Sequence, residues 1–176
     1  MNPEALVGLF VTADTRPGDR RLALAGLRPT VVLAARLAVI TLGVALSTAA
    51  ALAVTAAVFS PRQWALYFAA NLLIAGCYAL IGVILAPVFD RVAGVFIAFL
   101  FPFLDLGIAQ SPMLRGQPAA WAHYLPGYGG TRVLIDAAVT DTFDETRSLL
   151  IALSWIAVLT VTAAVIYRRA IRPARR

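Results

Sequence analysis

The sequence predicts an all-α fold: a polytopic membrane helix bundle with about four transmembrane helices, the third of them kinked or re-entrant. Of its 176 residues, 61% are hydrophobic and only 14% are charged, whereas an average soluble domain is about 25% charged. The mean hydropathy of +0.83 points the same way. Disorder is excluded as well, because disordered chains are poor in aliphatic residues and rich in charge.

Three stretches carry no charged residue and are long enough to span a bilayer: Leu37 to Pro61, Gln63 to Phe89 and Ser148 to Tyr167. A helix rises about 1.5 Å per residue, so about 20 apolar residues cross a hydrocarbon core of about 30 Å. We therefore expect membrane helices at about 33–59, 64–86 and 148–167.

The fourth apolar stretch, which gives a membrane element at about 87–108, is less regular. Its only charge between Val92 and Leu114 is Asp105, and Pro102 lies inside it. Proline removes a backbone donor and clashes with the preceding turn, so the helix should kink or stop near Pro102. Asp105 is then either a functional group at depth or the cap of a re-entrant turn near the outer interface.

The basic residues set the expected orientation. All fifteen are arginines, and an N-terminal segment in the cytoplasm places eleven of them inside and four outside. The positive-inside rule therefore predicts two cytoplasmic termini, with a segment at 1–32 and a basic tail at 168–176. Arginines flanking apolar spans orient a membrane protein, so no nucleic-acid partner is expected. The arginine-only, alanine-rich composition is typical of GC-rich bacteria and suggests the bacterial cytoplasmic (inner or plasma) membrane.

The cytoplasmic segment contains a candidate short helix. Asp19 is a plausible N-cap, and the run RRLALAGLR that follows has a mildly apolar face with arginines on the remainder. Such a helix can lie on the anionic leaflet or dock into a groove of a cytoplasmic partner.

The extracytoplasmic segment at 109–147 is expected to form a cap over the bundle. Trp121, His123, Tyr124 and Tyr128 are amphipathic residues of the kind found at headgroup level. The glycines of GYGGTR indicate a turn, and RVLIDAAV indicates a short helix that buries Val133, Leu134 and Ala137.

This order of parts resembles the type-2 permease family of ATP-binding-cassette (ABC) exporters. The similarity lies in Asp14, Arg16, Gly18 and RRLALAGLRP, in YLPGYGGTRVLIDAAV with Pro126, and in the basic ending YRRAIRPARR. The resemblance implies six membrane helices with a cytoplasmic coupling helix between the second and third. The first two have no counterpart here, which implies a truncated product or one part of a split permease.

The resemblance implies a transport subunit that moves an amphipathic, drug-like or lipid-like solute outward. It also implies an ABC ATPase subunit as partner, with ATP and magnesium on that subunit, and a second permease copy or a missing permease part.

GYGGTR lacks the Lys-Ser/Thr pair of a phosphate-binding loop, so this chain is not expected to be an enzyme or to bind a cofactor. The lone Cys77 and His123 build no metal site. The residues expected to couple to the ATPase are Asp14, Arg16, Gly18, Asp19, Arg20, Arg21 and Arg28.

Small residues four apart in the first span form a face for packing within the bundle or for a dimer: Gly43, Ser47, Ala51 and Thr55. Polar residues of a possible pathway or gate are Asn71, Asp90, Arg91 and Asp105, although an interhelical hydrogen bond is the more ordinary role for Asn71. The alternative function is a non-transporting membrane protein that acts as an assembly or regulatory partner. An ion-coupled carrier is disfavoured, because such relays use several intramembrane acids.

Overall fold

The computed structural model describes residues 29–86, 88, 89, 91–110 and 120–171, and within these ranges every regular element is a helix. Four helices are long and apolar enough to span a membrane: Leu37–Ala56, Trp64–Leu85, Val92–Ala109 and Thr146–Ile166. The predicted all-α bundle of about four spans is confirmed. The residues predicted to couple to an ATPase, and Asp90, lie outside the described residues.

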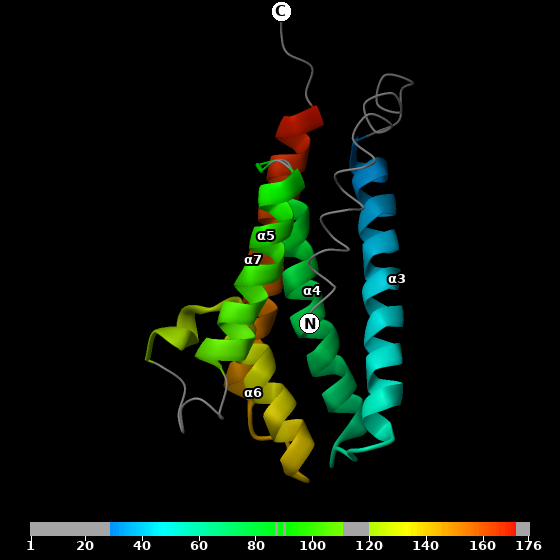
Figure 1. The fold of residues 1–176 in the computed structure, drawn as a ribbon, viewed down its shortest axis with the longest axis vertical. Helices are drawn as coiled ribbons and strands as arrows, with labels where there is room; N and C mark the ends of the chain where they lie inside the picture. Colours follow the sequence, from blue (N-terminus) through cyan, green and yellow to red (C-terminus); the bar gives the residue numbers. More distant parts are fainter. Residues whose placement is uncertain (1–28, 87, 90, 111–119, 172–176) are drawn as a thin grey trace, which may run out of the picture.

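The long helices alternate in direction (Figure 1). Helix α3 (Pro29–Ala56) descends, α4 (Trp64–Leu85) ascends, α5 (Arg91–Pro102) descends and α7 (Thr146–Ile171) returns upward. Helix α4 is the central element, because α3, α5, α6 (Pro126–Val139) and α7 all pack against it. We call the end where α3 stops and α4 starts the lower end of the bundle.

Helix α3 packs on α4 through a single stripe of side chains. The buried positions recur every four residues and are Ile40, Val44, Thr48 and Leu52. The predicted small-residue face at Gly43, Ser47, Ala51 and Thr55 lies one position away from that stripe and is half-buried, apart from Ala51, which is exposed. The hydroxyl of Thr55 donates to the Ala51 carbonyl within the helix, at 2.9 Å. The stripe of Ile40, Val44, Thr48 and Leu52, and not the predicted small-residue face, therefore makes the main contact of α3.

The third span changes its helical form at Pro102. Helix α5 ends there as an α-helix, and the chain continues as the π-helix η1 (Phe103–Ala109). The ring of Pro102 removes an N–H and crowds the carbonyl one turn earlier, which favours a wider turn. The backbone N–H of Gln110 reaches the carbonyl of Asp105 five residues back, at 3.0 Å. The expected end of the regular α-helix near Pro102 is thus confirmed.

The segment predicted to form a turn is instead the start of α6. Gly127, Gly129 and Gly130 all lie inside this helix, behind Pro126 at its first position. Their role is close approach: a Cβ on Gly130 would overlap the Ile74 side chain, and one on Gly129 would overlap the Ser148 carbonyl oxygen of α7. The prediction of a turn was wrong because glycine also serves where two backbones must nearly touch.

Helix α6 is a half-length helix wedged into the lower part of the bundle, between α4 and α7 (Figure 1). Val133 and Ala137 are fully buried, as expected, and Leu134 is partly buried. At its lower end the backbone N–H of Gln63 donates to the Ala137 carbonyl at 2.9 Å, and the Gln63 amide donates to the Thr140 carbonyl at 3.0 Å. The segment is therefore packed into the bundle and does more than cover it.

Candidate functional site

A buried polar cluster joins three parts of the bundle at the upper end of α6. We call it the Asp105 cluster; its members are Tyr78 of α4, Asp105 of η1, Gln110 after η1, and Gly127 of α6. Asp105 is only 1% exposed, and Tyr78 is fully buried. An ionisable side chain at such depth needs hydrogen-bond partners, because an unpaired one costs several kcal/mol, on the order of the stability of a small domain.

Asp105 is well supplied with donors. Its Oδ2 accepts from the Tyr78 hydroxyl at 2.6 Å and from the Gly127 backbone N–H at 2.9 Å. Its Oδ1 accepts from the Gln110 amide at 3.1 Å, and that amide also donates to the Ala122 carbonyl at 3.2 Å. All the side-chain partners donate to Asp105, so the carboxyl group acts only as an acceptor. One residue thereby holds α4, η1 and α6 together.

Local sequence explains why each group arrives at this point. Pro126 suits the first turn of a helix, where its missing N–H has no intrahelical partner to lose. The next residue, Gly127, leaves its N–H free for an outside acceptor, and the positive end of the α6 dipole faces the carboxylate. A Cβ on Gly127 would lie 2.6 Å from the Tyr78 hydroxyl, so only glycine lets the helix end come this close.

The geometry is that of a buried contact that connects three elements, rather than that of a catalytic centre. The carboxyl group is sequestered, and no other acidic side chain approaches it in the described part of the chain. No group of three or more His, Cys, Asp or Glu side chains that could hold a metal ion occurs among the described residues. What the cluster can do is transmit a displacement of α6 to η1 and α4, because moving α6 breaks the bond from Gly127.

The other predicted site residues lie apart from this cluster. The Asn71 amide donates to the Tyr67 carbonyl at 2.8 Å, one turn earlier in α4, so the bond found is intrahelical and not the interhelical one we expected. Arg91 begins α5 at the upper end of the bundle. His123 is exposed in the short 3-10 helix η2 (Ala120–Tyr124), with its ring 4.4 Å from that of Tyr128.

Sequence reasoning singled out Asp105 but not its partners. The signal for Tyr78 was present, because a tyrosine hydroxyl inside an uncharged span must find an acceptor. Gln110 carried no such signal, since it stands at the edge of the apolar run. The glycine at 127 indicates backbone freedom, and nothing in the sequence indicates that its N–H bonds an acceptor outside the helix.

Comparison with protein-family models, with curated proteins and with solved structures found no match for this chain.

Proposed function

We propose that this chain is the membrane-spanning permease subunit of an ABC-type exporter that moves an amphipathic, drug-like or lipid-like solute outward. The ATP is hydrolysed by a separate subunit. The observation that carries the proposal is the half-length helix α6, whose upper end meets the buried Asp105 within a four-span bundle. Half-helices that end at a polar group inside a bundle are recurrent parts of transport proteins, as are ionisable residues at depth.

The proposed orientation follows from charge. With both termini in the cytoplasm, the arginine-rich N-terminal segment and tail meet the inner leaflet of a bacterial cytoplasmic membrane, and α6 lies at the outer side. The ATPase then contacts the segment around Arg20, Arg21 and Arg28. A second permease copy, or a further permease part, packs beside this chain in the bilayer.

In this scheme the contact between Asp105 and the start of α6 is the part that opens and closes. Force from the ATPase enters near the start of α3 and reaches α4 through the stripe from Ile40 to Leu52. Helix α4 carries Tyr78, which donates a hydrogen bond to Asp105. A shift of α4 therefore pulls on Asp105 and weakens its hydrogen bond with Gly127. Opening and closing that contact gates the outer part of the pathway.

Charge reversal tests the coupling. The full chain is co-expressed with the ABC ATPase encoded beside it, and the ATPase that co-purifies is measured with and without nucleotide. The triple variant Arg20→Glu, Arg21→Glu, Arg28→Glu should lower the co-purified ATPase by roughly tenfold or more, because each reversal places like charges at the contact. The matched control is Arg62→Glu with Arg147→Glu at the opposite end of the bundle, which should leave association unchanged.

Two outcomes count against the proposal. If the triple variant associates as well as the wild type, the arginines do not form the coupling surface. If the wild-type chain never associates with the ATPase, the alternative of a non-transporting assembly or regulatory partner is favoured.

A further inference from the structure

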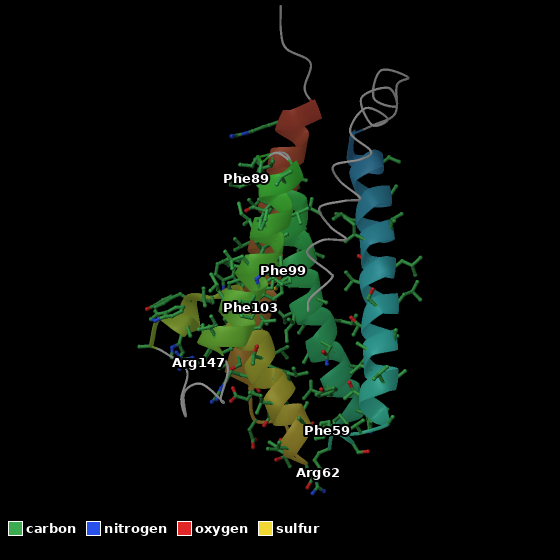
Figure 2. The ribbon with its side chains drawn as sticks, viewed as in Figure 1. Phe59, Arg62, Phe89, Phe99, Phe103 and Arg147 are labelled. Atoms are coloured by element: carbon green, nitrogen blue, oxygen red, sulfur yellow. The ribbon has the colours of Figure 1, made fainter. Side chains whose placement is uncertain are left out.

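An open pocket of about 550 Å³ lies beside the first turn of α7, apart from the Asp105 cluster. Side chains from η2, from α6 and from the start of α7 line it: His123, Tyr124, Tyr128, Glu145, Arg147 and Ile151. Its walls are thus aromatic and charged, with an aliphatic group where α7 continues into the bundle. Figure 2 labels Arg147 near η2, toward the lower end of the bundle.

Among the described residues that line the pocket, one positive charge has no partner. Glu145 is already engaged, because the Arg132 guanidinium lies 3.5 Å from its carboxylate and the Ser148 hydroxyl donates to it at 2.5 Å. Arg147 is exposed and has neither an ion pair nor a side-chain hydrogen bond within the described ranges. An anion entering the pocket would therefore meet a guanidinium whose donors are all available.

Two further polar groups face the same space. The Nδ1 of His123 donates to the Ala120 carbonyl at 2.9 Å, so the Nε2 of the neutral ring is an acceptor for a hydroxyl group of a ligand. Tyr124 is 80% exposed, so its hydroxyl is free to bond a ligand. Arg147 and the Tyr124 hydroxyl can therefore donate to an oxyanion, while the His123 Nε2 can accept from a hydroxyl group beside it.

The position of the pocket indicates where such an anion would come from. Arg147 is the second residue of a span that begins at Thr146, so it lies near the edge of the hydrocarbon region. It also starts an exposed apolar stripe of α7, because positions three or four apart share a helix face. The exposed residues of that stripe are Leu150, Ser154, Val158, Val161 and Val165, and the one polar member, Ser154, donates its hydroxyl to the Ile151 carbonyl within the helix. A charged group thus stands directly at the head of a lipid-facing surface.

We propose that this pocket binds the phosphate headgroup of a glycerophospholipid, with Arg147 as its charged ligand and the acyl chains along the exposed stripe of α7. The pocket accommodates a phosphate with part of its glycerol, and the stripe supplies the apolar contact that a free phosphate would not use. The proposal is independent of whether the chain transports anything.

Lipid titration followed by native mass spectrometry tests it on the purified full chain. Phosphatidylglycerol is compared with diacylglycerol of the same acyl chains, which lacks only the phosphate headgroup. The wild type should bind phosphatidylglycerol roughly tenfold more tightly than diacylglycerol, because a charge-assisted hydrogen bond lowers a dissociation constant by about tenfold or more. Arg147→Gln should remove that preference while leaving diacylglycerol binding unchanged. Leu150→Ser should weaken both lipids.

The matched control is Arg62→Gln. Arg62 is also at the lower end of the bundle and its side chain is 63% exposed, but it already lies 3.8 Å from Asp141 and lines no part of this pocket. Its replacement should leave both affinities unchanged. An equal loss in Arg62→Gln and Arg147→Gln would mean general charge attraction and would overturn the proposal. Displacement of the lipid by inorganic phosphate would also overturn it, because the pocket would then recognise a free anion.

Discussion

Helices α6 and α3 are attached to the bundle in opposite ways. Helix α6 has 14 residues, is in contact with both α4 and α7, and is tied by hydrogen bonds at its upper and lower ends. Helix α3 has 28 residues, yet it meets α4 mainly through one stripe and exposes apolar side chains elsewhere, Leu42 and Leu46 among them. Length and hydrophobicity therefore do not measure how firmly a helix is held in this molecule.

The physical reason is the solvent. In lipid, apolar surface gains little by leaving the bilayer for a helix interface, so close packing and hydrogen bonds decide association. The glycines of α6 permit close packing, and Asp105 and Gln63 supply hydrogen bonds to that helix. Helix α3 has no side-chain hydrogen bond to another element within the described residues.

The strongest way to break this contrast is Gly129→Ala. The added methyl group would overlap the Ser148 carbonyl oxygen and lie 2.8 Å from the Ala152 nitrogen, both of them backbone atoms that cannot move aside. We expect a loss of about 4 kcal/mol or more in the free energy of unfolding. Thermal unfolding in detergent, followed by size-exclusion chromatography, measures it.

Gly76→Ala is the matched control for that variant. A Cβ at Gly76 of α4 would lie 3.4 Å from the Cδ1 of Ile156, an ordinary contact with a flexible side-chain end. The replacement should be neutral or should stabilise the protein by up to about 1 kcal/mol, because alanine favours the helix over glycine. Equal unfolding temperatures for the two variants would refute the close approach of α6 to α7.

Asp105→Ala should have the next largest effect. It orphans the Tyr78 hydroxyl, the Gly127 N–H and the Gln110 amide inside the bundle. We expect a loss of about 3 kcal/mol, with Tyr78→Phe costing about 1 kcal/mol because it removes a single donor. Chemical unfolding in mixed micelles gives both values. A stable Asp105→Ala variant would show that the cluster does not anchor α6.

A pair of leucines in α3 sharpens the comparison from the other side. Leu52 is 8% exposed on the stripe that meets α4, whereas Leu46 is 63% exposed on the opposite part of the same helix. Leu52→Ala should cost about 1–2 kcal/mol through lost packing, and Leu46→Ala less than about 0.5 kcal/mol. Thermal shift of the purified variants separates them. If Leu46→Ala destabilised as much as Leu52→Ala, α3 would have to pack against a second surface.

Apart from the control variants, the smallest effect is expected for Gln63→Ala at the lower end of α6. Its side-chain amide donates to the Thr140 carbonyl at 3.0 Å in a half-buried setting, and the backbone bond to Ala137 survives the change. We expect a loss of about 1 kcal/mol. Hydrogen exchange of the amides at the end of α6 should accelerate, while those at Gly127 keep their protection. Uniform acceleration along α6 would mean that its two ends do not act separately.

Several elements followed from the sequence because a single property specified them. The spans over α3, α4 and α7 correspond to uncharged stretches, since charge is excluded from the hydrocarbon region wherever a helix packs. The end of α5 followed from Pro102, since the missing N–H acts within its own turn. Even the burial of Val133 and Ala137 followed from periodicity alone.

The candidate site required more than one element to be placed. Asp105 stood out as the acid inside a span, but two of its three donors come from positions 27 residues earlier and 22 residues later in the chain. Asn71 also shows that the partner cannot be read from the residue type. An amide in a span needs an acceptor, and here a carbonyl of its own helix is that acceptor instead of a group on another helix. Side-chain chemistry predicts that a partner exists and leaves open which one.

The sequence by itself determined that lipid is the main solvent of the described helices, where the four spans among them lie, and that the third one breaks. These depend on the free energy of placing each residue in lipid and on the covalent geometry of proline, both of which are local. Only the tertiary structure decided that GYGGTR is helical, that α6 enters the bundle, and that Asp105 closes onto its first turn. Those outcomes depend on which backbones come close enough to touch, and glycine permits a turn and a close approach equally well.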